Sequence, residues 1–262
     1  MYIKDSNIAI IHDWFIEKSF GGSEKVTFII NDLFNKRYSC PDIFSLTSNI
    51  DNSKRKLFKQ NKIYTSFIQS LPFGKTNVQR YLPFLPYAVE QFDLSKYDLV
   101  ISSSHAFAKG VLTSPNQVHI SYVHTPMRYA WDQMHTYLKK SSLSKYGLEI
   151  PLRFILYKLR EWDYYSSQRM DYIIANSNFT SKRIKKYWGL NCEVIHPPVD
   201  TKRFNYNECR GNYYLSVNRL VPNKRVDLLI RAFNRLNLPL IIIGDGPERL
   251  KLEKMSNSNI KF

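Results

Sequence analysis

The chain has 262 residues, of which 44% are hydrophobic and 15% are aromatic. This composition is typical of a packed globular protein and excludes a disordered chain, and the length suffices for one large domain or two ordinary ones. The formal net charge of +16 predicts an acidic partner, either nucleic acid, an anionic membrane surface or a phosphorylated substrate.

Other features of the composition exclude further classes. The cysteines Cys40, Cys192 and Cys209 are widely spaced, which predicts neither a disulfide framework nor a metal site. No apolar run approaches the roughly 20 residues that a membrane span needs. Because the first residues also lack the pattern of a signal peptide, we expect a cytoplasmic protein.

Strands and helices alternate along the first three quarters of the chain. Ile8–His12 is apolar and β-branched, which predicts a buried parallel strand, followed by a Gly-Gly turn and a helix over about Ser23–Asn35. Apolar residues at helical spacing predict the buried face of this helix: Val26, Ile29, Ile30, Leu33 and Phe34. Further strands are expected at Asp42–Leu46, Leu99–Ser102, Val118–Val123 and Tyr172–Ala175.

The segment His196-Pro197-Pro198 interrupts this alternation and predicts a linker. Alternation then restarts, with strands expected at Tyr213–Val217, Leu240–Ile243 and Asn259–Phe262 and helices at Val226–Leu236 and Glu248–Lys254. Strands that alternate with helices indicate an α/β fold with mainly parallel sheets. We therefore expect one complete α/β domain, a hinge, and a second α/β domain that stops early.

Gly21 and Gly22 lie between the first strand and the first helix. Glycine at this place lets the backbone approach a ligand closely, and a helix N-terminus favours an anion. The spacing is not the GxGxxG of a dinucleotide site. Two interpretations fit: a phosphate-binding loop, or a plain tight turn with Ser23 as the helix N-cap.

His124 follows the expected strand Val118–Val123, at the strand end where open α/β sheets bind ligands. Polar and aromatic residues crowd the segment behind it: Thr125, Arg128, Tyr129, Trp131 and Asp132. A neutral histidine with such neighbours can position a substrate hydroxyl or stabilise developing charge. The alternative is a core histidine beside a packed tryptophan.

The stretch Tyr213–Asp227 reads YYLSVNRLVPNKRVD and predicts a strand, a basic turn with Arg219 and Lys224, and a helix. Amide groups and the helix dipole at such a turn favour a phosphate, over which the two cationic side chains can close. The alternative is an ordinary turn with solvated charges.

The stretch Pro151–Tyr165 predicts a basic amphipathic helix. Its apolar face is formed by Leu152, Ile155, Leu156, Leu159 and Trp162, and its charge comes from Arg153, Lys158 and Arg160. Such helices are typical of proteins that lie on an anionic membrane surface. The alternative is a helix that faces the core and exposes a solvated basic side.

The motifs follow one another in a fixed order: HDWF, GGSEKV, YDLVISSSHAFAKG, HTPMRYAWD, DYIIANSNFTSKRIKKYWG, VIHPPVDTKRF, YLSVNRLVPNKRVDLLIRAF and IIIGDGPERLKLE. This combination covers essentially the whole chain and closely resembles the family 4 glycosyltransferases of the GT-B fold. The branch that it resembles builds bacterial surface polysaccharides, often as mannosyltransferases.

The resemblance implies two Rossmann-like, doubly wound domains that face a cleft: an acceptor-side domain over residues 1–195, and the first part of a nucleotide-sugar-binding domain over residues 196–262. It also implies a GDP- or UDP-sugar donor, retention of anomeric configuration, no bound metal and no further cofactor.

Several residues match positions with known roles in the family. Arg219 and Lys224 match the pair that neutralises the donor diphosphate, and His124 matches a histidine near the transferred sugar and is our candidate catalytic residue. Gly21 and Gly22 match a loop that reaches towards donor phosphate or acceptor. A loop near the nucleotide is matched by Gly244, Asp245 and Gly246.

The chain departs from the family pattern in one respect. The family carries a glutamate pair spaced E-(x)7-E, and nothing like it occurs before Phe262. We therefore expect a truncated product or the first piece of a split gene, with an incomplete second domain and reduced activity alone. A separately encoded C-terminal fragment is then a candidate partner.

The leading hypothesis is transfer of a sugar, with mannose as one candidate, to a lipid-linked or saccharide acceptor in lipopolysaccharide, capsule or other envelope polysaccharide biosynthesis. The enzyme would act in the cytoplasm, at the inner face of the membrane. The alternative is a non-catalytic remnant that binds a membrane or a partner chain. We expect no nucleic-acid partner, because helix-turn-helix, zinc-finger and RNP patterns are absent.

Overall fold

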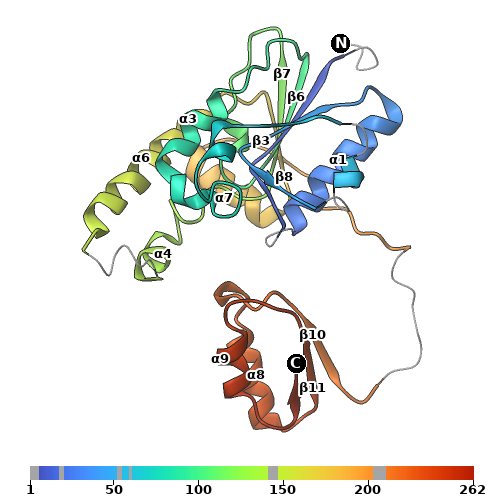
Figure 1. The fold of residues 1–262 in the computed structure, drawn as a ribbon, viewed down its shortest axis with the longest axis vertical. Helices are drawn as coiled ribbons and strands as arrows, with labels where there is room; N and C mark the ends of the chain where they lie inside the picture. Colours follow the sequence, from blue (N-terminus) through green and yellow to red (C-terminus); the bar gives the residue numbers. More distant parts are fainter. Residues whose placement is uncertain (1–5, 18–20, 52–54, 59–60, 141–146, 203–210) are drawn as a thin grey trace. The chain divides into compact units, whose positions relative to one another are not determined.

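The computed structural model describes residues 6–17, 21–51, 55–58, 61–140, 147–202 and 211–262. The chain divides into two compact units, Met1–Val199 and Asp200–Phe262, where the sequence predicted a boundary between residues 195 and 196. Each unit has its own parallel sheet with its own helices (Figure 1).

Seven parallel strands form the main sheet of the first unit: β1 (Ile8–His12), β3 (Asp42–Ser45), β5 (Ile63–Thr65), β6 (Leu99–Ser104), β7 (Val118–Val123), β8 (Tyr172–Ala175) and β9 (Glu193–Val194). Their order is β5-β3-β1-β6-β7-β8-β9, so the direction of strand addition reverses between β1 and β6. In open parallel sheets, such a reversal leaves a crevice outside the carboxyl ends of the two flanking strands.

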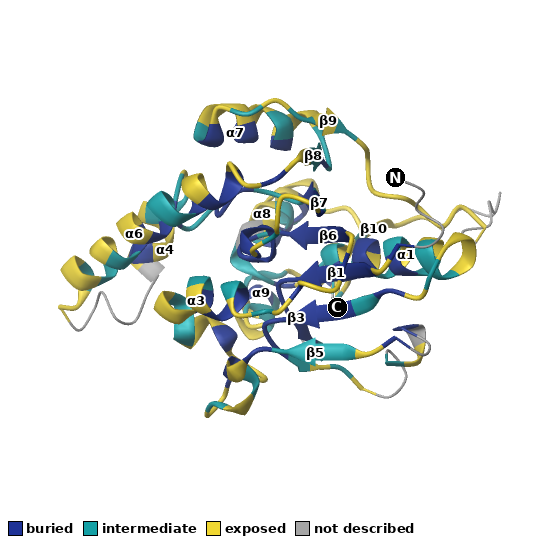
Figure 2. Ribbon diagram, turned by 90° about the horizontal axis from the view of Figure 1, so that it is seen from above, coloured by how far each residue is buried: buried dark blue, intermediate teal, exposed yellow. Residues whose placement is uncertain are grey.

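Helices cover both faces of this sheet. Ile8 and Ile10 pack on one face with α1 (Gly22–Arg37), while Ala9 and Ile11 lie on the other in a core that includes α3 (Leu85–Glu90) and α6 (Glu149–Ser167). Figure 2 shows the central strands β1, β3 and β6 as the buried centre of the unit. The remaining elements are α4 (Met134–Lys140), α7 (Asn178–Trp188), the parallel pair β2 (Phe15–Ile16) and β4 (Ser48–Asn49), and 3-10 helices at Lys56–Phe58, Phe67–Ser70, Val78–Phe84 and Ala108–Gly110.

The inner face of α1 is more polar than its apolar pattern predicts. Ile29 and Leu33 are 42% and 43% exposed, whereas the buried residues of the helix are Glu24, Val26, Thr27 and Asn31. The polar ones have partners: Thr27 hydrogen bonds with Ser103 of β6, and the Asn31 amide donates to Asn61. Because these bonds orient the helix, part of the predicted apolar face points to solvent.

Helix α6 packs its apolar face against the core, as the alternative interpretation predicted. Leu156 and Leu159 are buried in the main core cluster, while the basic side forms surface ion pairs such as Arg153–Glu149 at 2.6 Å. The same helix also has an outer apolar surface, because Ile150 is 80% exposed and Phe154 is 60% exposed.

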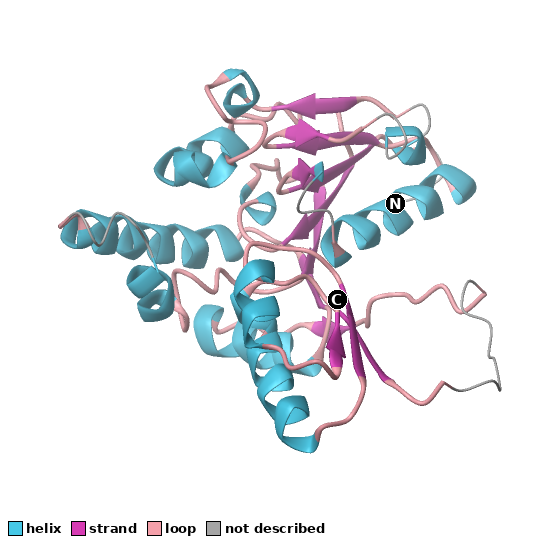
Figure 3. Ribbon diagram, turned by 60° about the horizontal axis from the view of Figure 1, so that its bottom comes forward, coloured by secondary structure: helices cyan, strands magenta, loops and turns pink. Residues whose placement is uncertain are grey.

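The second unit has a three-stranded parallel sheet in the order β10 (Tyr214–Val217), β11 (Leu240–Ile243) and β12 (Ile260–Lys261). Both of its long helices, α8 (Val226–Leu236) and α9 (Arg249–Met255), lie on one face of that sheet (Figure 3). The opposite face presents apolar side chains to solvent: Leu215, Val217 and Ile243 are 55%, 66% and 53% exposed.

These observations confirm the predicted α/β fold with parallel sheets in two units. The bounds of β1, β7, β8, β11 and α8 agree with the sequence predictions. Within the described ranges, we find no helix with both the length and the apolar character required to traverse a bilayer.

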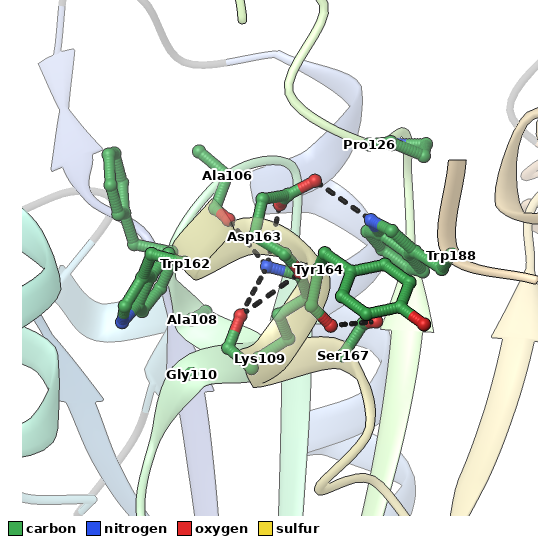
Figure 4. A network of polar contacts seen from close by, with 12 residues as sticks. Ala106, Ala108, Lys109, Gly110, Pro126, Trp162, Asp163, Tyr164, Ser167 and Trp188 are labelled. Carbon is green, nitrogen blue, oxygen red and sulfur yellow. Dashed lines mark hydrogen bonds and ion pairs between the residues drawn. The ribbon is translucent and has the colours of Figure 1, made fainter. Parts of the chain in front are cut away.

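A buried ion pair joins four segments of the first unit (Figure 4). Lys109, 1% exposed, lies 2.7 Å from the carboxylate of Asp163, which is fully buried in α6. The other carboxylate oxygen accepts hydrogen bonds of 2.8 Å from the indole groups of Trp131 and Trp188. The ammonium group also contacts the Ser166 hydroxyl at 3.0 Å. Such extensive pairing is what makes two charges tolerable inside a protein.

Replacing Lys109 by methionine should lower the free energy of unfolding by about 3–5 kcal/mol, because Asp163 would remain buried without its cation. Urea unfolding followed by tryptophan fluorescence measures this in the first unit alone, since that unit holds all four tryptophans: Trp14, Trp131, Trp162 and Trp188.

The matched control is Lys158→Met, which breaks a surface ion pair between Lys158 and Glu161 at 2.9 Å in α6, the helix that also contains Asp163. It should have a much smaller effect because water already screens that pair. Equal destabilisation by the two substitutions would contradict a special role for the buried pair.

Candidate functional site

In the first unit, the candidate site begins at the carboxyl ends of β1 and β6, where the strand order reverses. His12 ends β1 and Asp13 follows it, while Ser103 and His105 stand at the end of β6. His124 follows the neighbouring strand β7 and donates its backbone amide to the Ser104 carbonyl at 2.8 Å. Parallel pairing therefore brings these polar residues to one edge of the sheet.

Asp13 holds the loop after β6 through the backbone. Its fully buried carboxylate accepts hydrogen bonds from the amides of residues 105–108, at 2.7 Å from His105 and 2.9 Å from Ala108. Burial alone would raise the pKa of Asp13, but the neighbouring His105 and His12 and these amides outweigh it, so the pKa lies below its usual value. Asp13 is therefore a fixed negative charge that shapes the loop.

His124 is held by its Nε2 atom, which lies 2.9 Å from the Ser103 hydroxyl. Ser103 in turn lies 2.7 Å from the Thr27 hydroxyl of α1, and His12 Nδ1 lies 3.1 Å from the same Thr27 oxygen. Burial, together with the nearby His12 and His105, lowers the pKa of His124 to about 3. His124 is therefore a neutral imidazole at physiological pH and a member of a polar network, which distinguishes it from an isolated core histidine.

The Gly21–Gly22 turn is already capped by a carboxylate from its own helix. Gly21, rather than Ser23, is the N-cap of α1, and its amide donates to Glu24 at 2.9 Å. Glu24 is 3% exposed and also accepts from the Ser23 hydroxyl at 2.9 Å. A bound phosphate would meet this negative charge, so the local geometry is better suited to a ligand hydroxyl than to an anion.

In the second unit, Arg219 and Lys224 lie in the turn between β10 and α8. Both side chains are exposed, and neither forms a hydrogen bond or ion pair with any residue in the described ranges. The turn tightens through a 3-10 helix at Pro222–Lys224, and Arg225, with φ of 50°, starts α8 without a side-chain cap. Two cations without a partner in the described residues thus lie in one turn beside the N-terminus of α8, whose first turn also carries Asp227, paired with Arg225 at 3.0 Å.

The Gly244–Gly246 loop is hydrogen bonded to this turn along the backbone. The Asn218 amide donates to Ile243 at 3.0 Å, and the Leu220 amide donates to Asp245 at 2.9 Å. A Cβ atom on Gly244 would lie 1.8 Å from the Asn218 carbonyl oxygen, so only glycine allows this approach. The two loops form one rigid edge around Arg219.

The candidate residues therefore fall into two groups. In the first unit, Thr27 of α1, the helix that begins at Gly22, is joined to His124 through Ser103, and in the second unit backbone hydrogen bonds join the two loops around Arg219. Asp13, Ser103 and Glu24 were not among the residues predicted from the sequence. The rule that selected His124, a polar residue at the carboxyl end of a strand, would also have selected Asp13.

Within the described ranges, no three His, Cys, Asp or Glu side chains are grouped as metal ligands.

Comparison with protein families gives two adjoining matches. The family described as Glycosyltransferase Family 4 matches residues 41–203, which is more than half of the chain. The family described as Glycosyl transferases group 1 matches residues 199–260.

Curated relatives align with shorter segments. The chain is 30% identical to an alpha-1,3/1,6-mannosyltransferase of Candida albicans over 88 residues, which are 28% of this chain and 20% of that protein. It is 32% identical to an uncharacterized glycosyltransferase of Methanocaldococcus jannaschii over 95 residues, 36% of this chain and 27% of that protein. These alignments thus span about a quarter of the relatives or less.

Solved structures share the fold over nearly the whole chain. TarM has a TM-score of 0.59 at 10% identity, with 100% of this chain and 77% of that chain covered. The lipopolysaccharide outer core galactosyltransferase WaaB has a TM-score of 0.51 at 18% identity, with 95% of this chain and 64% of that one covered. On the family match and this shared fold, the chain belongs to glycosyltransferase family 4.

Proposed function

We propose that this chain supplies residues of a metal-independent, retaining glycosyltransferase that takes a sugar from a GDP- or UDP-sugar donor. The acceptor is a lipid-linked or saccharide molecule of the cell envelope, such as a lipopolysaccharide or capsule precursor, and the reaction takes place at the cytoplasmic side of the membrane. Mannose is our first candidate sugar, since one curated relative bears the name of a mannosyltransferase.

The observation that carries the proposal is that Arg219 and Lys224, beside the N-terminus of α8, are exposed and have no partner within the described residues. The leaving group of a nucleotide sugar is a nucleoside diphosphate, whose negative charge grows as the glycosidic bond breaks. Two cations and the backbone amides of the same turn can stabilise that charge without a metal ion. A TarM structure with UDP bound, whose TM-score to this chain is 0.56, is in keeping with a uridine nucleotide as one donor class.

His124 takes the role of candidate catalytic residue beside the transferred sugar. Its low pKa keeps the imidazole neutral, so it can hydrogen bond to a sugar hydroxyl without adding positive charge. Gly21 and Gly22 would then line the place of the acceptor or donor, and Gly244, Asp245 and Gly246 the place of the nucleotide.

The alternative is a non-catalytic module that binds a partner chain, and one observation favours it. The exposed face of the second sheet, with Leu215, Val217 and Ile243, is apolar and lies opposite both helices. A separately encoded α/β fragment that supplies helices for this face is the partner that would fit. Sugar transfer by the purified chain alone would argue against the alternative, whereas transfer only after such a fragment is added would support it.

We further propose that the outer face of α6 contacts an anionic membrane surface. Ile150, Phe154 and Tyr157 are 80%, 60% and 45% exposed and recur at the spacing of one helix face. The net charge of +16 provides long-range attraction to anionic lipid, and the apolar side chains provide burial in the interface.

Replacing Arg219 or Lys224 by alanine should weaken nucleoside diphosphate binding roughly ten- to hundredfold, because each removes charge-assisted hydrogen bonds to phosphate. Isothermal titration with GDP and UDP measures this. Arg235→Ala removes an equally exposed charge from the far end of α8 and should leave the affinity unchanged. If Arg235→Ala weakens binding as much as Arg219→Ala, the charges act only through the overall field, and the proposed site is wrong.

Replacing Ile150 by serine should weaken binding to vesicles of phosphatidylcholine and phosphatidylglycerol roughly tenfold, since a buried isoleucine is lost from the interface. Co-sedimentation measures the bound fraction. Leu250→Ser changes a comparably exposed helical residue, 75% against 80%, in the second unit and serves as the control. Binding that is indifferent to lipid charge and to Ile150 would refute the membrane proposal.

A further inference from the structure

The hydrogen bonds of His124 end in a backbone carbonyl, and this end point determines where the protons lie. His124 Nε2 is 2.9 Å from Ser103 Oγ, Ser103 Oγ is 2.7 Å from Thr27 Oγ1, and Thr27 Oγ1 is 2.9 Å from the carbonyl oxygen of Ser23. Ser103 and Thr27 are fully buried, so water does not compete for these bonds.

Protons can be assigned along this chain from the carbonyl outwards. The single proton of the Thr27 hydroxyl has two oxygens in reach, the Ser23 carbonyl at 2.9 Å and the Ser103 hydroxyl at 2.7 Å. The carbonyl can only accept whereas the Ser103 hydroxyl can also donate, so we assign the Thr27 proton to Ser23. Thr27 Oγ1 then accepts from the Ser103 hydroxyl, and Ser103 Oγ is left to accept from His124 Nε2. The reverse order would place two oxygens, those of Thr27 and Ser23, 2.9 Å apart with no proton between them.

His12 completes this assignment from the other side. Its Nδ1 lies 2.9 Å from the Ser103 carbonyl oxygen, which again only accepts, so His12 Nδ1 carries a proton. That N–H also lies 3.1 Å from Thr27 Oγ1 and supplies the second donor that this oxygen can accept. Thr27 then donates once and accepts twice, which uses its full capacity.

We propose that Thr27 and Ser103 are positioning residues that fix neutral His124 as the Nε2–H tautomer and leave its Nδ1 as a bare hydrogen-bond acceptor. His124 is only part-buried, and Nδ1 has no partner among the residues that the structure describes. A bare nitrogen accepts from a hydroxyl and repels a phosphate oxygen. His124 therefore selects a ligand hydroxyl.

The identification of the hydroxyl as part of a sugar rests on the proposed function, whereas the tautomer of His124 does not.

The test is a two-bond proton–nitrogen NMR correlation of the histidine side chains in the full chain without substrate. His124→Gln identifies the His124 signals among those of the six histidines. The expected result is a protonated Nε2 and a bare Nδ1 for His124. A protonated Nδ1 with a bare Nε2 would overturn the proposal.

A pair of variants tests the cause. Thr27→Ser keeps the hydroxyl and should keep the tautomer. Thr27→Val has nearly the same shape without the hydroxyl, so the Ser103 proton loses its acceptor and can turn to His124 Nε2. We expect the Nδ1–H tautomer to become populated in Thr27→Val, and an unchanged spectrum would overturn the role of Thr27. If Thr27→Val does not fold, the wild-type tautomer remains decisive.

The same measurements separate this inference from the proposed function. Titration with a GDP- or UDP-sugar that leaves every His124 signal unchanged, in a chain with the expected tautomer, would count against the proposed function alone. A wrong tautomer in a chain that binds the nucleotide sugar would count against the inference alone.

Discussion

Parallel strand pairing is the constraint on which the rest of this structure depends. In both units it brings the carboxyl ends of strands to a common edge, and several residues of those edges directly follow such an end: Asp13 after β1, His105 after β6, His124 after β7, and Gly244 after β11, with Arg219 close behind β10. Residues that are far apart in the sequence thereby become neighbours, and the loops, rather than the strands, are left to vary with function.

The two edges are built for different chemistry. In the first unit, buried polar groups such as Asp13, Thr27 and Ser103 form hydrogen bonds with neighbouring side chains and with the backbone. These bonds hold the edge in place and leave few charged groups there to bind an anion. In the second unit, Arg219 and Lys224 are exposed and unpaired within the described residues, so that edge is available to an anion. This division is the basis of our proposal that the second unit holds a diphosphate and that the first meets sugar hydroxyls.

Much of the fold could be predicted from the sequence because its strands are continuous apolar runs. The bounds of β1, β7 and β11 follow from such runs. The buried polar face of α1 could not be predicted from the sequence, because the partner of Thr27 is Ser103, which lies 76 residues away in a strand. The burial of Lys109 could not be predicted either. Its sequence neighbours do not reveal its partner, Asp163 of α6, which lies 2.7 Å from it in the fold. Polar partners distant in sequence leave no local pattern.

We propose that the turn between β10 and α8 binds the diphosphate of a nucleotide sugar. A crystal structure of the chain with GDP or UDP bound would show where the diphosphate lies. We expect phosphate oxygens within hydrogen-bond distance of Arg219 and Lys224, beside the Gly244–Gly246 loop. A diphosphate bound at the Gly21–Gly22 turn instead, with Arg219 and Lys224 still without a partner, would contradict it.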